Sequence, residues 1–350
     1  MLPLIKRNLK RAKLAYLWIT RILLAPNRFG VSLFTRLRFA CFGGYVADQV
    51  ALYDLKRQPR GTYLSEFDWY RSRWINEPFD SMLNNKIVCN EILQHHIKVP
   101  RIFYVKNKGR VKSLERPDAL RAIDEVLETL QQEGTLFLKP LGSGRGKGVH
   151  RLDAELGAFQ LDRRQVSAES IRELLTEEDG WFLSEGIEQH PDIARLYPDT
   201  SNTVRLITLR DPHSGELKIF FAVMRIGTAE TVPVDNGSRG GLVAKIDLDS
   251  GVLTEARTLW SNESHTMHPD SGTPILGSRV PEWTTVKTQV MDVARAFPYL
   301  QFIAWDILIA EDGPYIIEAN TSSGVNIIQI WGAQGRGELG DFYRAHGVIR

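Results

Sequence analysis

The sequence predicts an α+β protein with largely antiparallel sheets. Short apolar runs with the composition of strands recur along the chain, turn signals join several of them as hairpins, and segments of helical periodicity lie between them. This mixture argues against a doubly wound parallel sheet. With 350 residues, of which 43% are hydrophobic and 25% charged, the chain can bury a core in two or three subdomains.

The first segment of the chain is strongly basic. Residues 1–47 hold nine Lys or Arg and no Asp or Glu, and Arg21 splits their apolar residues into runs shorter than the roughly 20 that span a bilayer. We therefore expect neither a transmembrane helix nor a signal peptide. The pattern predicts an amphipathic helix with Tyr16 and Trp18 near a basic face, which suits either an anionic membrane surface or the core of the protein itself.

Beyond an irregular stretch expected over residues 57–76, the chain predicts ordered elements. One helix should begin at Asn84 or Asn85 as its N-cap and end near residue 96, and another should run from Pro117 to the glycine at 134. A third helix is predicted over residues 284–297 from its apolar spacing. The predicted strands are 101–105, 135–138, 180–187, 202–209, 217–224 and 242–248.

A glycine-rich loop follows the strand that ends in Lys139. Glycine occupies every second position from 142 to 148, which allows backbone N–H groups to approach an anion, while Lys139, Arg145 and Lys147 supply positive charge. The loop matches neither the P-loop nor the dinucleotide fingerprint. It predicts a lid over a polyphosphate, and a flexible surface hairpin is the alternative.

A second polar cluster interrupts a predicted hairpin near the C-terminus. Apolar runs 302–310 and 315–320 flank a turn that contains glycine and proline. Strand alternation places Glu318 and Asn320 on one face, and pairing across the turn brings Asp306 opposite them within a residue of register. Oxygen ligands that converge in this way predict a Mg²⁺ site, whereas a carboxylate facing solvent or paired with an arginine is the alternative.

A phosphate-binding loop upstream and a magnesium site downstream together indicate nucleotide-dependent phosphoryl chemistry. The polar residues occur in the order Lys86, Lys139-Pro140, Glu185, Arg205, Asn236 with Gly240-Gly241, Asp306, and Glu318-x-Asn320. This order resembles the ATP-grasp superfamily over roughly residues 75–335, and it is most similar to the sugar-transfer-associated ATP-grasp proteins and the related α-L-glutamate ligases. One departure is Asn85, since relatives often carry Asp before the lysine.

The resemblance implies two α+β subdomains that grip ATP, with residues 1–80 as a basic, helical extension, residues 81–182 as the subdomain with the lysine and the glycine loop, and residues 183–350 as the subdomain with the hinge and the metal hairpin. It implies that Arg205, Lys139 and Asn236 are catalytic and that Asp306, Glu318 and Asn320 hold two Mg²⁺ ions. The nucleotide-binding residues that it implies are Lys86, Lys139, Gly142, Ser143, Gly144, Arg145, Gly146, Lys147, Gly148, Glu185, Ile187 and Glu188.

The superfamily's usual reaction joins a carboxylate to an amine or another nucleophile through an acyl phosphate. The resemblance therefore implies such a ligase, acting on small-molecule or glycan-linked substrates in bacterial surface polysaccharide biosynthesis. A phosphotransferase on the same fold and a non-catalytic nucleotide-binding module that docks on membranes are the alternatives. The two cysteines, Cys41 and Cys89, are too few for a disulfide framework and favour the cytoplasm. Residues 1–47 would provide peripheral contact with the inner membrane, and no nucleic-acid partner is expected.

The segment from Asp235 to Gly241 leaves two interpretations open. Asp235 and Arg239 could contact substrate, or they could belong to a simple turn.

Overall fold

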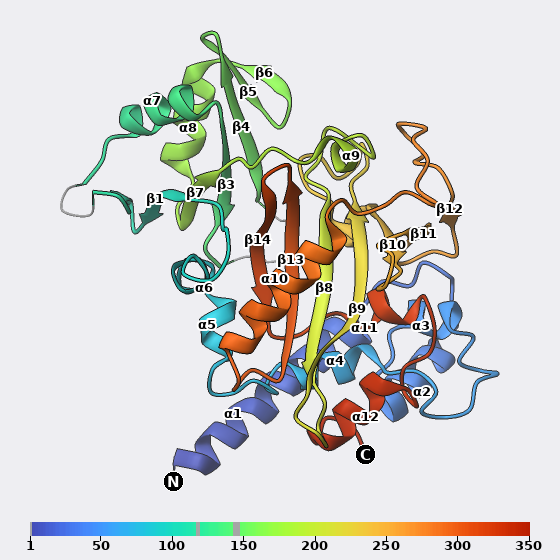
Figure 1. The fold of residues 1–350 in the computed structure, drawn as a ribbon. Helices are drawn as coiled ribbons and strands as arrows, with labels where there is room; N and C mark the ends of the chain where they lie inside the picture. The colour runs from blue at the N-terminus through green and yellow to red at the C-terminus, as the bar shows by residue number, and fades with distance from the viewer. Residues whose placement is uncertain (1, 117–119, 143–147) are drawn as a thin grey trace.

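The computed structural model describes residues 2–116, 120–142 and 148–350. Within these residues the strands form two seven-stranded sheets, and every ladder between named strands is antiparallel. The sheets lie in different parts of the molecule, with helices packed on both (Figure 1). The predicted α+β class is confirmed.

The first sheet has the order β2-β1-β7-β3-β4-β5-β6. Helices α7 (Ile123–Glu133) and α8 (Ala168–Glu177) pack on it and share one hydrophobic core with it. Helix α7 ends where Gly134 adopts a φ of +78°, a conformation that favours glycine. The strands of this sheet are β1 (Ile102–Asn107), β2 (Arg110–Ser113), β3 (Thr135–Pro140), β4 (His150–Glu155), β5 (Ala158–Leu161), β6 (Arg164–Val166) and β7 (Trp181–Glu185).

The second sheet has the order β12-β11-β10-β9-β8-β13-β14. Helices α5 (Asp80–Asn84), α6 (Lys86–Leu93) and α10 (Trp283–Ala296) contribute to the core on one face. Helices α11 (Val325–Gln329) and α12 (Glu338–Ala345) contribute to the core on the other. The strands are β8 (Thr203–Arg210), β9 (Leu217–Ile226), β10 (Leu242–Ile246), β11 (Leu253–Thr258), β12 (Ser264–His265), β13 (Phe302–Ala310) and β14 (Gly313–Asn320). The short helix α9 (Pro191–Ala194) lies in the connection from the first sheet to the second, and the 3₁₀ turn Gly237–Arg239 lies between β9 and β10.

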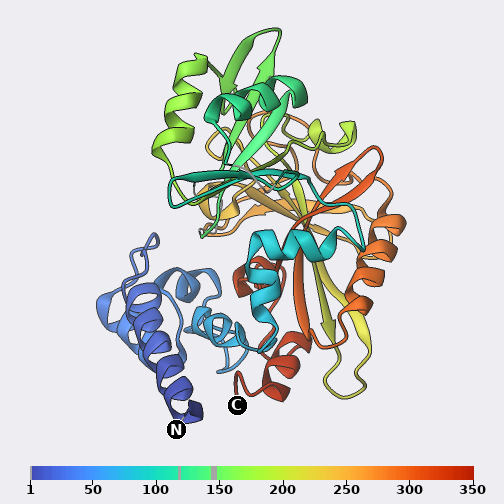
Figure 2. The same cartoon turned by 90° about the vertical axis from the view of Figure 1, so that its left-hand side faces the viewer.

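The N-terminal lobe, residues 2–72, packs beside the second sheet, and Figure 2 shows it as a separate group of helices. It consists of α1 (Leu2–Leu17), a π-helical turn (Trp18–Leu23), α2 (Leu33–Gly43), α3 (Ala47–Leu52) and α4 (Glu66–Ser72). The Trp18 indole donates a hydrogen bond to the Ala40 carbonyl at 3.2 Å, and this bond joins the first helical segment to α2. Among the described helices, none is both long enough and apolar enough to cross a lipid bilayer.

Most predicted elements are present, and the carboxylate hairpin has the predicted strand 302–310. Two predictions were wrong. Residues 57–76 are not irregular throughout, because Ser65 caps α4 by accepting a hydrogen bond from the Asp68 amide at 3.1 Å. The second predicted helix begins at Ile123 and not near Pro117, a residue that lies outside the described part of the chain.

The expected subdomain boundaries at 80/81 and 182/183 remain predictions. Strand β7 lies across the second of them and pairs only within the first sheet, through β1 and β3. Helix α6 follows the first boundary in the sequence, yet its Cys89 and Leu93 belong to the core of the second sheet. The first subdomain therefore contributes α6 and most of α5 to the packing of the second.

Candidate active site

The C-terminal hairpin carries the centre of the candidate site. In the ladder between β13 and β14, Asp306 lies opposite Glu318, and Asn320 lies opposite Ala304. This is the register that strand alternation predicts. All residues of β13 are buried, so Asp306 is a carboxylate within an apolar strand, with its side chain 8% exposed. A buried carboxylate requires compensating positive charge.

Two arginines from neighbouring strands supply that charge. The Arg205 guanidinium on β8 donates to both carboxylate oxygens of Asp306, from Nε to Oδ1 and from Nη2 to Oδ2 at 2.8 Å. Arg225 on β9 places Nη1 3.0 Å from Oδ2 of the same carboxylate. These arginines outweigh the effect of burial and hold the pKa of Asp306 below its usual range.

Arg225 also joins Asp306 to a second buried carboxylate. Its Nη2 donates to Oδ1 of Asp235 at 2.6 Å, while Oδ2 of Asp235 accepts from the Thr203 amide at 2.8 Å. Burial opposes the charge of Arg225, but Asp235 and Asp306 raise its pKa above the ordinary value. Burial raises the pKa of Asp235, and Arg225 opposes that shift. Asp235 thus anchors Arg225, while a contact of Asp235 or Arg239 with substrate stays a prediction.

The hairpin faces a cavity of about 850 Å³. Five of the predicted site residues line it: Arg205, Asn236, Asp306, Glu318 and Asn320. The Asn236 side chain accepts hydrogen bonds from the backbone and hydroxyl of Ser238 at 3.0 and 2.8 Å, which holds its amide at the start of the 3₁₀ turn. The predicted catalytic and metal-binding residues of the second sheet therefore share one cavity.

The N-terminal lobe forms another wall of this cavity. Its contributions include Lys13, Arg21, Arg28, Trp69 and Tyr70, and Arg73 and Trp74 follow directly after it in the chain. Arg28 is already paired with the nearly buried Asp48 at the cavity wall. Sequence reasoning placed this lobe outside the site, and it also missed Arg225. A signal for Arg225 existed, because it is a charged residue within the apolar run of β9.

The two predicted phosphate-binding lysines lie beside the hairpin. Lys139 is near the end of β3, and Lys86 is the first residue of α6, where the Asn85 side chain caps the helix by accepting from the amides of Ile87 and Val88 at 3.1 and 3.2 Å. Burial, and then the charge of Lys86, lower the pKa of Lys139 to about 8, while Glu318 acts in the opposite direction. The two lysines and Glu318 are therefore within electrostatic range of one another, although they come from both sheets and the helix between them.

The glycine-rich loop is described only at its two ends. Gly142 and Gly148 are exposed, and Gly148 adopts a φ of +74°, a conformation that other residues rarely take. Ser143, Gly144, Arg145, Gly146 and Lys147 lie outside the described residues. Their assignment to phosphate binding remains a prediction from the sequence.

The predicted adenine-binding segment leaves the first sheet at the end of β7. Glu185 is its last strand residue, and its carboxylate accepts from the Arg101 amide at 3.1 Å and lies 3.5 Å from the Arg101 guanidinium. Ile187 is partly buried and Glu188 is exposed in the connection that follows. Glu185 thus has a structural partner, whereas its role and those of Ile187 and Glu188 in nucleotide binding remain predictions.

The oxygen atoms around the cavity suit a hard divalent cation. Glu318 and Asn320 contribute a carboxylate and an amide oxygen to the cavity wall. Asp306 also lines the cavity, but both of its oxygens accept hydrogen bonds from arginine. Within the described residues, no group of three or more His, Cys, Asp or Glu side chains is arranged to hold a metal ion. The donor set thus fits Mg²⁺ through Glu318 and Asn320, with Asp306 restrained by its arginines.

Comparison with solved structures finds several enzymes at low similarity, among them an ATP-grasp ligase. The ATP-grasp ligase PsnB in complex with its precursor peptide and AMPPNP is 14% identical, with 77% of this chain and 60% of that one covered and a TM-score of 0.41. The D-alanyl-alanine synthetase A of Vibrio cholerae is 13% identical, covering 77% of this chain and 66% of that one, with a TM-score of 0.41. The N5-carboxyaminoimidazole ribonucleotide synthetase purK is 16% identical, covering 69% and 46%, with a TM-score of 0.39. The chain matches less than half the length of the purK protein.

No curated protein shows significant similarity to the chain. The family comparison is more informative, because the sugar-transfer associated ATP-grasp family matches residues 69–340. That range includes both sheets, the hairpin and both lysines, and it begins within α4 of the N-terminal lobe. It confirms the resemblance that the order of polar residues indicated. The chain belongs to the sugar-transfer-associated ATP-grasp family and has an α+β ATP-grasp fold.

Proposed function

We propose that this protein is an ATP-dependent ligase that activates a carboxylate as an acyl phosphate and transfers the acyl group to an amine or another nucleophile. The observation that carries the proposal is the position of Glu318. Glu318 lines the cavity together with Asn320 and Arg205, and its negative charge also favours the protonated form of Lys139 by raising the pKa of that lysine. Glu318 is thus close both to a cavity that could hold the acceptor substrate and to two lysines, Lys86 and Lys139, that could bind phosphates.

In the first step, an oxygen of the substrate carboxylate would attack the γ-phosphorus of ATP, and the bond from that phosphorus to the β-phosphate oxygen would break to release ADP. Lys139 and Lys86 would offset the charge of the nucleotide phosphates. Glu318 and Asn320 would hold Mg²⁺, which lowers the cost of bringing two anions together. Asp306 would keep the Arg205 guanidinium oriented toward the cavity, because both carboxylate oxygens of Asp306 accept hydrogen bonds from that guanidinium.

In the second step, the nucleophile would attack the acyl carbon, the bond from that carbon to the phosphate oxygen would break, and inorganic phosphate would leave. An amine nucleophile would lose a proton as the amide forms. Arg205 lies where it can stabilise negative charge on the acyl phosphate, because it lines the cavity while its position is fixed by Asp306. This chemistry requires no nucleophile from the protein, and positioning supplies much of the rate enhancement.

The cavity has room for a substrate larger than a simple amino acid. Its volume of about 850 Å³ lies in the upper range of small-molecule sites. Aromatic and cationic side chains of its walls, including Trp74, Trp260 and Arg21, suit a sugar that carries negative charge. We extend the proposal on this basis: the substrate is a carboxylate linked to a glycan, and the reaction belongs to the assembly or modification of a bacterial surface polysaccharide.

A trapping experiment tests the ligase proposal. Purified protein is incubated with ATP, Mg²⁺ and a panel of uronic acids, amino acids and hydroxy acids, with and without hydroxylamine. We expect ADP release that depends on one acid, together with the matching hydroxamate. A stable phosphorylated acceptor that resists hydroxylamine would show a phosphotransferase instead, and nucleotide binding without turnover across the panel would favour a non-catalytic module.

A further inference from the structure

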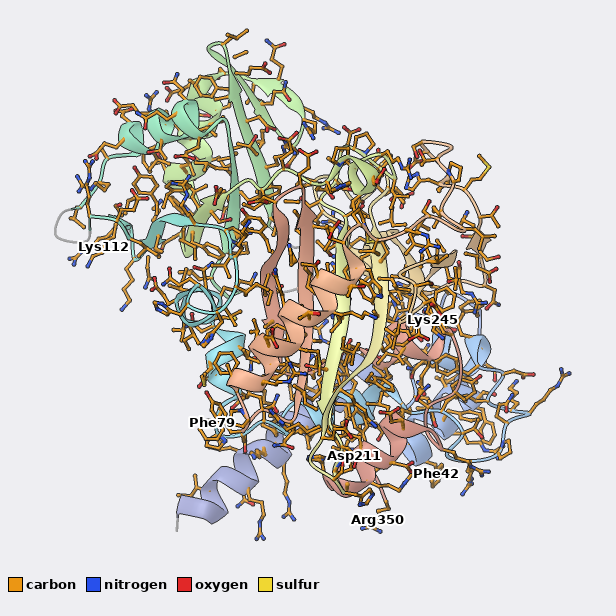
Figure 3. All side chains as sticks on the ribbon, viewed as in Figure 1. Phe42, Phe79, Lys112, Asp211, Lys245 and Arg350 are labelled. Atoms are coloured by element: carbon orange, nitrogen blue, oxygen red, sulfur yellow. The ribbon has the colours of Figure 1, made fainter. Side chains whose placement is uncertain are left out.

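The N-terminal lobe exposes an apolar surface that its own packing does not use. Most of the large apolar side chains exposed among the described residues belong to this lobe, and α2 carries the strongest group: Leu33, Phe34, Leu37 and Phe42 are 68%, 78%, 41% and 84% exposed. Phe42 projects at the surface in Figure 3. Single exposed apolar residues are common, but a cluster on one short helix marks an interaction surface.

The opposite face of α2 fixes how this surface is presented. Ala40 is buried against the π-helical turn and accepts the Trp18 indole hydrogen bond. The Arg36 guanidinium donates to the carbonyls of Leu23 and Ala25 at 3.3 Å. Residues 34, 37, 38 and 41 share the outer face, since they follow helical spacing and all are exposed. The exposed residues are therefore held outward and do not result from fraying.

Positive charge accompanies the apolar side chains on α2 and recurs elsewhere in the lobe. Arg38 is exposed on α2 itself, and Arg7 and Arg11 are exposed on α1, which runs away from α2 toward the N-terminus in Figure 1. None of the three has a carboxylate partner among the described residues. No acidic residue occurs before Asp48. In a contact between two copies of this surface, like charges would face each other, so the charge argues against self-association through it.

We propose that the N-terminal lobe docks the protein on an anionic lipid bilayer, with Leu33, Phe34, Leu37 and Phe42 inserted among the headgroups and the arginines paired with lipid phosphates. Exposed aromatic and aliphatic residues with flanking cations are the combination that binds such an interface without spanning it. The inner side of α1 is committed to the fold, because Leu14, Leu17 and Trp18 pack in the core of the lobe. Of the two sequence-based interpretations of the segment with Tyr16 and Trp18, packing on the protein's own core holds for Trp18, and the proposed membrane contact lies on the outer face of α2 instead.

Docking would also place the cavity next to the membrane-bound lobe. Arg21 and Leu24 of the lobe line the cavity, so the bilayer contact and a wall of the candidate site belong to the same unit. A deletion of residues 1–25 would remove Arg7 and Arg11 together with part of the cavity wall, and it would also remove Ile22, which packs against α2. Substitutions on the outer face are therefore the cleaner test.

The test measures binding to vesicles of phosphatidylcholine with about one third phosphatidylglycerol by co-sedimentation at low and high salt. The apolar variant replaces Leu33, Phe34, Leu37 and Phe42 by serine. Its matched control replaces Leu120, Leu156, Met267 and Leu276, which are also exposed but lie outside the lobe, by serine. We expect the apolar variant to bind at least tenfold more weakly than the parent protein and the control to bind like the parent protein.

The charge variant carries Arg7→Gln, Arg11→Gln and Arg38→Gln, and its control carries Arg110→Gln, Lys112→Gln and Lys245→Gln. Both lower the net charge equally, and Figure 3 labels Lys112 and Lys245, which lie away from α2. Each arginine near an anionic surface contributes about fivefold in affinity, so the charge variant should lose roughly 100-fold at low salt. The control should lose far less, and the difference should shrink as salt screens the charges.

Cys41 offers a direct reporter, because it is exposed beside Phe42 whereas Cys89 is buried. An environment-sensitive fluorophore on Cys41 should shift its emission to the blue with anionic vesicles and not with vesicles of phosphatidylcholine alone. Equal vesicle binding by the apolar variant and its matched control would overturn the proposal. Equal binding of the parent protein to anionic vesicles and to vesicles of phosphatidylcholine alone would also overturn it. A concentration-dependent dimer that the apolar variant abolishes, without vesicle binding by the parent protein, would identify a second copy as the occupant.

Discussion

Arg205 and Arg225 of the second sheet have environments opposite to those of Arg7, Arg11 and Arg38 of the N-terminal lobe. Arg205 and Arg225 have side chains that are 15% and 18% exposed, and both are bound to carboxylates. Arg7, Arg11 and Arg38 are exposed, and they have no carboxylate partner within the described residues. Arginine side chains are thus buried and held by carboxylates in the second sheet, whereas in the N-terminal lobe these three are exposed surface charges.

This difference separates two roles. A buried arginine is tolerated only with its carboxylates in place, so Asp306 and Asp235 restrict its position and orient what it presents to the cavity. An exposed arginine keeps its hydration and rotamer freedom, and it contributes little to folding. Its charge remains available to an anionic partner. Substitution of the buried arginines should therefore change stability and activity, whereas substitution of the exposed arginines should change binding to vesicles.

The largest effect should come from Glu318→Ala. Loss of this carboxylate removes a metal ligand next to the phosphate-binding lysines, and we expect ATP turnover to fall at least about 1,000-fold while the fold is retained. Glu311→Ala is the control, because Glu311 is exposed at the turn of the same hairpin. Coupled ADP release and thermal unfolding measure the two properties. Turnover at the parent rate in Glu318→Ala would refute the site.

Arg225→Leu should have the next largest effect, and it should act on stability as well as activity. Asp235 and Asp306 would remain buried without their shared cation, which costs about 3–5 kcal/mol in the free energy of unfolding. Urea unfolding measures this loss. Arg225→Lys should recover part of it, whereas Arg164→Leu on the exposed edge strand β6 should change stability by less than about 0.5 kcal/mol. Similar values for Arg225→Leu and Arg164→Leu would show that the network does not stabilise the fold.

The affinity for nucleotide should depend on pH through Lys139. Its pKa is about 8 in the free protein, and contact with phosphates would raise it, so binding favours the protonated amine. Affinity should be level below pH 7 and should fall by up to about tenfold per unit above pH 8. Calorimetric titration with ADP measures the profile. Lys139→Arg should flatten it, since arginine stays charged, and an unchanged slope in that variant would point to another group.

The smallest expected effect is the change in stability when the exposed arginines of the N-terminal lobe are replaced. Replacing Arg7, Arg11 and Arg38 by glutamine should alter the free energy of unfolding by less than about 0.5 kcal/mol, because exposed charges without partners contribute little to folding. The same variant should show the large loss of vesicle binding expected above. A stability loss near that of Arg225→Leu would mean that these arginines belong to the fold, and the contrast between the two regions would disappear.

Local pattern was sufficient for much of the fold. The hairpin strand 302–310, the Asn85 cap and the end of α7 at Gly134 follow from apolar runs, turn residues and capping chemistry within a few positions of one another. Strands β2, β4, β5, β6, β11 and β12 were not predicted. None of them has more than two buried residues, so their hydrophobic pattern is a weak signal.

The candidate site could be predicted in part for the same reason. Asp306 and Glu318 are close in a hairpin, so their register follows from the turn. Arg225 reaches the site through the pairing of β9 with β8, and Asp235 through its hydrogen bonds to Thr203 and Arg225. Neither contact can be read from the local sequence. The match of the family to residues 69–340 confirms the family resemblance, while the individual roles of the site residues stay predictions.

By itself the sequence determined the α+β class, the carboxylate hairpin and the basic first segment, because alternation, turn chemistry and charge are local properties. Only the tertiary structure decided that two arginines neutralise Asp306, that Lys139 lies near Lys86 and Glu318, and that the N-terminal lobe walls the cavity. The tertiary structure also decided which apolar side chains of the N-terminal lobe are exposed to solvent. These outcomes depend on packing between segments far apart in the chain, and that packing is set by the burial of the whole molecule rather than by neighbouring residues.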